Sequence, residues 1–168
     1  EYPLRVSRWK STPDEVVDFD DIADRVVQMA AEVSSTGETV VPRRVGGFGL
    51  LNALVATPLS MVLAELVQNA VEHGLGQGPG RIEVRVRRFD EGPDLPGASS
   101  LELAVSDDGG GLPEDFDLEN TTSLGLQIVR TLVVGELGGT LSVKPRDSGG
   151  TEVAISLPLD HEEGEVPR

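Results

Sequence analysis

Three polar residues recur at every fourth position of an otherwise apolar stretch: Glu65, Asn69 and His73. In an α-helix these positions stack along one side, so a carboxylate, an amide and an imidazole would stand in a row. Carboxylate and amide oxygens are suitable ligands for a hard divalent cation, which in turn binds phosphate oxygens. A solvated helix surface would show the same spacing. Because glycine-rich motifs follow, we favour a wall that binds metal and phosphate.

The stretch that carries this row has the features of one helix that ends at Gly74. Thr57 is a suitable N-cap, Pro58 suits the first helical position, and Gly74 suits the stop. One broad apolar stripe is expected to face the core: Leu59, Val62, Leu63, Leu66, Val67 and Ala70.

A first glycine-bearing stretch, Asp107-x-Gly109-x-Gly111, comes directly after a predicted strand. A carboxylate there can accept a hydrogen bond from an exocyclic amine, and glycines let the backbone approach a flat ring closely. A plain Asp-Gly turn would explain the stretch equally well.

Two further stretches follow it. Residues 123–126, SLGL, lead from a loop into a helix, whose free N–H groups and positive dipole end suit an anion. Gly149, Gly150 and Thr151 enter the last predicted strand. Taken singly, an ordinary serine N-cap and a hairpin turn would explain them.

The composition excludes several classes of function. The 168 residues are 38% hydrophobic and only 4% aromatic, which fits one domain with an aliphatic core. A net charge of −15 argues against a nucleic-acid or anionic-membrane partner. The chain has no cysteine, and neither a signal peptide nor a membrane-length apolar run is seen. We therefore expect a soluble, cytoplasmic protein.

Periodicity predicts three helices and about five strands. A first helix begins at Asp18, with Ile22, Val26, Met29 or Ala30, and Val33 on its apolar side. The second is the helix described above, and the third covers residues 124–134, with Leu126, Val129, Leu132 and Val133 on its buried side.

Among the strands, residues 39–45 contain Pro42 and are expected at a sheet edge. Residues 81–89 and 101–105 alternate and should pair antiparallel, and residues 140–144 and 151–157 should form a closing hairpin. The predicted fold is α+β, a two-layer sandwich whose mostly antiparallel sheet is covered on one face by three helices. Residues 18–159 would form the domain, after a linker or helix end (1–17) and before an acidic tail (160–168).

Four motifs in fixed order carry a family resemblance: ELVQNAVEHG, DDGGGLP, SLGLQIV and GGTEVAISLPL. They resemble the N box and the three glycine boxes of the GHKL ATPases, which include gyrase, Hsp90, histidine kinases and MutL. No P-loop and no strand-linked GxGxxG competes with this interpretation. The SLGLQIVRTLV and closing GTxxxxxLP patterns resemble sensor histidine kinases, and NAVEHG with VDFDDIADRV resembles actinobacterial cytosolic kinases of the PdtaS type.

The resemblance implies ATP and Mg²⁺ as ligands. Asn69 would ligate the magnesium ion, and Glu65 would orient a metal-bound water or assist proton transfer. Asp107 would hold the adenine amine, while Gly109 and Gly111 would shape the pocket and begin a lid.

The same resemblance gives Leu124, Gly125 and Leu126 backbone contacts to the phosphates and places Thr151 beneath the base. His73 falls where related kinases often carry a phosphate-proximal aromatic or histidine residue, although a surface histidine fits equally well.

Three departures from the family pattern concern phosphate binding. Glu72 stands where many members have a lysine, the lid stretch 113–122 has four acids and no base, and Ser123 replaces a glycine. Phosphate binding should then depend on Mg²⁺ and backbone donors. We therefore expect a weak, steeply Mg²⁺-dependent nucleotide affinity.

The implied function is donation of the γ-phosphoryl of ATP to a histidine on a separate dimerisation domain, for relay to a response regulator. Neither His73, in the binding wall, nor His161, in the tail, suits the acceptor role, so the chain should be the catalytic half, monomeric in isolation and slow in turnover. An anti-sigma-factor serine kinase, a gyrase- or MutL-like ATPase and a degenerate docking module remain as alternatives.

Overall fold

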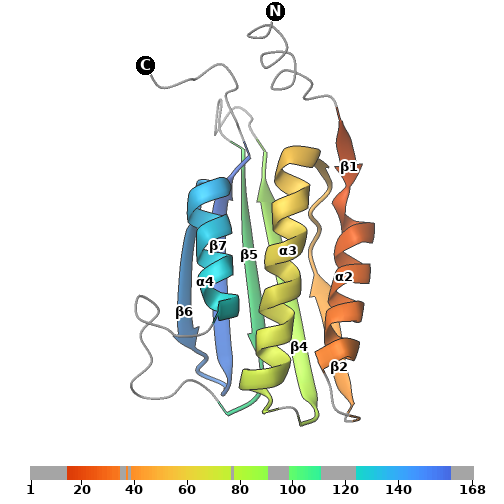
Figure 1. Ribbon diagram of the computed structural model, residues 1–168, viewed down its shortest axis with the longest axis vertical. Coiled ribbons are helices and arrows are strands. Elements are labelled where there is room, and N and C mark those ends of the chain that lie inside the picture. Colours follow the sequence, from red (N-terminus) through yellow and green to blue (C-terminus); the bar gives the residue numbers. More distant parts are fainter. Residues whose placement is uncertain are drawn as a thin grey trace, which may run out of the picture.

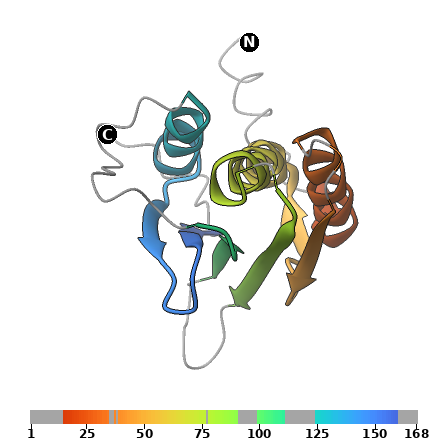
Figure 2. The same ribbon diagram turned by 90° about the horizontal axis from the view of Figure 1, so that it is seen from below.

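The computed structural model describes residues 15–34, 37, 39–76, 78–90, 99–110 and 124–159. A five-stranded sheet forms one layer, and helices pack on one of its faces to form the other (Figures 1 and 2). The predicted α+β two-layer sandwich is therefore confirmed. Gly111, the lid stretch 113–122, Ser123 and both termini lie outside the described residues.

The sheet is mixed, with one parallel pair at its edge and antiparallel pairs elsewhere. Its spatial order is β2 (Val40–Val45), β4 (Gly80–Phe89), β5 (Ser100–Asp107), β7 (Thr151–Pro158) and β6 (Thr140–Pro145). The antiparallel pairing of β4 with β5 and the closing hairpin of β6 and β7 match the prediction. So does the edge position of the proline-bearing strand.

Strand alternation divides the sheet into a core face and an open face. In β4, Ile82, Val84 and Val86 are buried beneath the helices, and the intervening charged residues therefore point to the other side. In Figure 2 the helices lie on one side of the sheet only. None of the described helices covers the second face.

A second, two-stranded sheet pairs β1 (Val16–Asp18) with β3 (Leu50–Asn52). The sequence did not predict it, because strands of three residues carry too little alternation to be recognised. The Asp20 carboxylate fastens the neighbouring loop by accepting hydrogen bonds from the backbone N–H groups of Phe48, at 2.7 Å, and Gly49, at 3.2 Å.

The first helix, α2 (Phe19–Ser34), was predicted correctly, but its apolar side only in part, since Ile22, Val26 and Ala30 pack against the core and Met29 and Val33 do not. Phe19, Ala23, Val27 and Ala31 face the core, Ile22, Val26 and Ala30 are half-buried, and Met29 and Val33 are 62% and 77% exposed. The Phe19 ring packs edge-on against Phe48, with centroids 4.8 Å apart, on the side of the helix that faces the core.

The central helix, α3 (Ala53–Asn69), continues as a π-helical turn, η1 (Ala70–Gly74). All six residues of its predicted stripe are buried, and it ends at Gly74 as expected. Its predicted start was wrong. The N-cap is Asn52, whose side chain accepts from the Leu54 N–H at 2.8 Å, so Thr57 and Pro58 lie inside the helix.

The earlier start has a physical reason, because it places Val55 and Ala56 in the core at 1% and 6% exposure. This burial outweighs the one helical hydrogen bond that Pro58 cannot make. Residues Ala53–Gly74 are long and apolar enough to cross a membrane. However, their apolar stripe fills the core between sheet and helices.

The third helix runs as α4 (Leu124–Arg130) and then as a second π-helical turn, η3 (Thr131–Glu136). Val129 and Val133 are fully buried, as predicted, whereas Leu126 and Leu132 are only half-buried. Helix α4 packs on α3, and this contact brings the start of α4 to the polar row of the central helix.

Candidate functional site

Asp107 ends strand β5 with only 3% of its surface exposed. Its carboxylate accepts hydrogen bonds from the backbone N–H groups of Gly109, at 2.9 Å, and Thr151. Burial raises the pKa of Asp107 above its ordinary value, and the neighbouring Asp108 charge adds to the increase. The two N–H donors and Arg146 oppose it. A carboxylate that is buried at this cost suits a site where a ligand donor completes its coordination.

Three glycines let separate backbone segments close around this carboxylate. A Cβ atom at Gly74 would overlap the Asp107 carboxylate, and one at Gly150 would overlap the Asp107 carbonyl oxygen. A Cβ atom at Gly109 would overlap the carbonyl oxygen of Gly74, which also accepts a hydrogen bond from the Gly110 N–H at 3.0 Å. The end of η1, the turn after β5 and the start of β7 are therefore in direct contact.

A second cluster forms where α4 begins. A Cβ atom at Gly125 would lie 2.6 Å from Glu65 Oε1 and 3.2 Å from Asn69 Oδ1, so the helix start lies directly over two residues of the polar row. The Asn69 amide nitrogen is buried and has no hydrogen-bond partner among the described residues. A buried amide of this kind is normally satisfied, so its state here indicates an incomplete site.

The central helix links the two clusters, because Asn69 and Gly74 are five residues apart, roughly 7–8 Å along a helix axis. Thr151, at 8% exposure, lies beside Asp107 as its hydrogen-bond donor. Leu124 is 68% exposed at the start of α4. His73 is exposed, and within the part of the chain that the structure describes it makes no hydrogen bond or ion pair with either cluster.

The donor set at the second cluster fits magnesium. Among the described residues no three His, Cys, Asp or Glu side chains are grouped to hold a metal. Mg²⁺, however, usually takes one or two protein oxygens and completes its shell with water and substrate phosphates. The oxygens of Asn69 and Glu65 meet that requirement.

Arg146 was not predicted as a site residue. Its guanidinium Nη1 donates to the Asp107 carbonyl oxygen at 3.0 Å from the turn between β6 and β7. In the sequence, the only sign of this role was that Arg146 is a single basic residue just before the last glycine stretch. Gly74 was predicted as a helix stop, and its second role, making room for Asp107, depends on a contact between residues 33 positions apart.

This arrangement, two clusters joined by one helix and closed by glycines, is that of a nucleotide-binding ATPase domain. The chain belongs to the histidine kinase-, DNA gyrase B- and HSP90-like ATPase family, whose pattern matches residues 54–161.

Among its relatives is the sensor histidine kinase PdtaS of Mycobacterium tuberculosis, 40% identical over 148 residues. PdtaS of Mycolicibacterium smegmatis is 41% identical over the same length. Each match covers 87% of this chain, which spans 28% of either relative. The histidine kinase domain of the Erythrobacter litoralis blue-light-activated kinase EL346 superposes with a TM-score of 0.72 at 26% identity, covering 88% of this chain and 64% of that one.

Replacing Gly109 by alanine should destabilise the fold, because the new methyl group overlaps the Gly74 carbonyl and one of the two backbones must move. Gly110→Ala is the matched control, since nothing lies within 4 Å of its added Cβ. We expect Gly109→Ala to lower the free energy of unfolding by about 1–3 kcal/mol in urea titrations. Equal stability of the two variants would contradict the described turn.

The raised pKa of Asp107 predicts how stability depends on pH. Because the folded-state pKa lies above the unfolded value, the ionised carboxylate costs stability at neutral pH, and this cost disappears as the pH falls through the raised pKa towards 3.8. Asp107→Asn should therefore be at least as stable as the wild type at neutral pH. Its advantage should vanish in acid, as measured by urea unfolding at both pH values.

Proposed function

We propose that the chain binds Mg²⁺–ATP across the two clusters and donates the γ-phosphoryl group to a histidine of a separate dimerisation domain. The observation that carries this proposal is the buried, unpartnered amide nitrogen of Asn69, a donor suited to a phosphate oxygen, on a side chain whose oxygen faces the start of α4. It lies on the same helix as the Gly74 contact with Asp107. A ligand with a base at one end and phosphates at the other fits that separation.

At the base end, the Asp107 carboxylate would accept a hydrogen bond from the adenine amine. Its remaining acceptor capacity allows this, since a carboxylate accepts more bonds than the two from Gly109 and Thr151. Thr151 would lie beneath the base. Gly109, and Gly111 beyond the described residues, would keep the wall flat enough for a ring to approach.

At the phosphate end, the backbone N–H groups of Leu124, Gly125 and Leu126 would donate to phosphate oxygens. Asn69 would hold a magnesium ion through its amide oxygen, and bound Mg²⁺ would neutralise phosphate charge. Glu65 would orient a metal-bound water or assist proton transfer. His73 would lie at the solvent side of the phosphates.

The acceptor histidine would lie in another domain of the parent kinase. His73 is exposed and joins neither cluster among the described residues, so we assign the acceptor role to a histidine outside this domain. Transfer to a response regulator would follow, with the domain working in the cytoplasm and monomeric by itself. The two PdtaS relatives, each more than three times as long as the matched region, support a multidomain parent.

Asn69→Ala should abolish measurable Mg²⁺–ATP binding in calorimetry while leaving the unfolding curve nearly unchanged, because the amide nitrogen makes no bond in the described structure. Gln68→Ala is the matched control, since Gln68 lines a groove between α2 and α3 instead. Chelation of Mg²⁺ should weaken wild-type binding as severely as the Asn69 change. ATP affinity that survives in excess EDTA would contradict the metal assignment.

Phosphotransfer itself can be tested with a dimerisation domain supplied in trans. We expect labelled ATP to yield an acid-labile, base-stable phosphoprotein, as a phosphohistidine should be, and the isolated chain to turn over little ATP alone. An acid-stable product on serine would instead support the serine-kinase alternative. If the chain binds ATP but transfers phosphate to neither histidine nor serine, the result would favour the docking-module alternative.

A further inference from the structure

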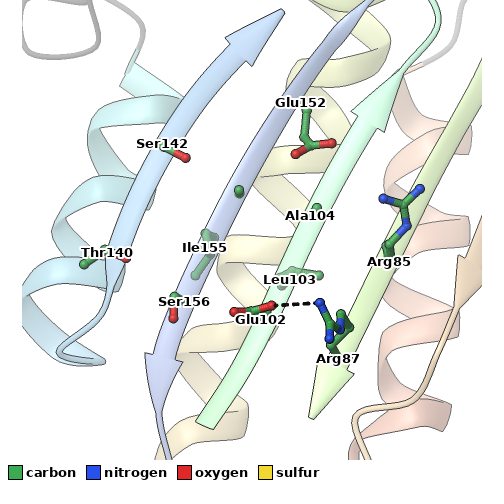
Figure 3. Close-up of a pocket in the computed structure, with 11 residues that line it drawn as sticks. Arg85, Arg87, Glu102, Leu103, Ala104, Thr140, Ser142, Glu152, Ile155 and Ser156 are labelled. Atoms are coloured by element: carbon green, nitrogen blue, oxygen red, sulfur yellow. Dashed lines mark ion pairs between the residues drawn. The ribbon is translucent and has the colours of Figure 1, made fainter. Parts of the chain in front are cut away.

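The open face of the sheet carries an unusual share of the positive charge in the chain. Figure 3 shows part of it, with the helices behind the sheet. Two shallow depressions there are lined by five of the 14 Lys and Arg residues: Arg43, Arg81, Arg85, Arg87 and Arg146. Four acidic residues line the same depressions, so five positive and four negative side chains leave a net charge of +1 there, in a chain of net charge −15: Glu83, Glu102, Asp108 and Glu152.

Strand register places these arginines. Odd-numbered residues of β4 point to the open face, and Arg43 of the parallel neighbour β2 lies opposite Glu83. Arg43 and Arg81 are therefore diagonal neighbours, about 7–8 Å apart at the backbone. They line the larger depression, about 620 Å³ in volume, together with Arg146.

Three of the five arginines already have partners. Arg85 pairs with Glu83 at 2.6 Å, Arg87 reaches Glu102 at 3.8 Å, and Arg146 donates to the Asp107 carbonyl. Arg43 and Arg81 have no ion pair among the described residues, and both are exposed. Two guanidinium groups are thus available to a ligand.

The smaller depression, beside Arg85 and Arg87, includes several small side chains in its lining. Figure 3 shows Ala104, Ser142 and Ser156 across three adjacent strands. Such a lining lets another backbone approach the sheet closely, whereas large side chains would hold it away.

The alternation of charges selects the kind of anion. Glu83 and Asp108 line the larger depression together with the arginines and would repel a polyanion that carries a charge on every unit. An extended peptide presents every second side chain on one side, about 7 Å apart, which matches the spacing of the two free arginines. The negative charge elsewhere is largely screened beyond about 8 Å at physiological salt.

We propose that the open sheet face docks an acidic, extended segment of a partner protein, whose carboxylates pair with Arg43 and Arg81. Arg146 borders the same depression and holds the Asp107 carbonyl oxygen. A docked carboxylate that draws this guanidinium away weakens its bond to Asp107. Docking therefore perturbs the base end of the nucleotide site, a consequence that rests on the proposed function.

The docking is tested with a fluorescent peptide of alternating glutamate and serine, about eight residues long, by anisotropy with the full chain and without nucleotide. Arg43→Glu and Arg81→Glu should each weaken binding on the order of tenfold. Arg25→Glu, an exposed change of equal charge on α2, should leave it unaltered. Equal loss in all three variants, no peptide binding, or stronger Arg81-dependent binding of inorganic polyphosphate would overturn the proposal.

The link to Asp107 is tested by the amide nitrogen resonance of Asp108, which shares a peptide bond with the Asp107 carbonyl. The peptide should shift this resonance in the wild type and not in Arg146→Gln, while both bind the peptide. The same shift in both proteins would overturn the link. Because no nucleotide is present, failure of ATP binding would refute the proposed function without affecting either result.

Discussion

The close approach of three backbone segments around Asp107 is the constraint on which the site depends. It requires glycine at positions 74, 109 and 150, since a single Cβ at any of them would occupy space that another segment fills. The contact draws the end of the central helix, the turn after β5 and the start of β7 to one point. That point lies at the end of β5, the middle strand of the sheet, where a buried carboxylate can still meet a ligand.

The central helix satisfies two requirements that would otherwise compete. Its apolar stripe, including Leu63 and Leu66, is buried almost completely and fixes the helix against the sheet. The opposite side carries Glu65 and Asn69 without contributing to the core. Since packing determines the rotation of the helix, the direction of the polar row is set by residues that never touch a ligand.

The sequence predicted those features of the fold that are controlled by a local pattern of residues. The stripe of α3, the alternation of β4 and the order of the glycine motifs are repeated signals, and the layers of the fold followed from them. The apolar side of α2 was predicted only in part, because the helix turns Phe19, Ala23 and Val27 most fully to the core, and the contact of Phe19 with Phe48 is one that no local period encodes. The start of α3 was predicted too late, because Asn52 is the N-cap and the Thr57-Pro58 pair, which has the pattern of a helix start, lies inside the helix.

The contacts of Arg146 and Gly74 with Asp107 were beyond prediction for a related reason, since both join positions more than 30 residues apart. They also surround a group that lowers the stability of the fold. A buried carboxylate with a raised pKa costs stability at neutral pH, and the fold limits that cost with two N–H donors and one guanidinium. None of these donors removes the charge. The acceptor capacity that remains on Asp107 is what a ligand would use, so the folding cost and the proposed binding selectivity have a single origin in this residue.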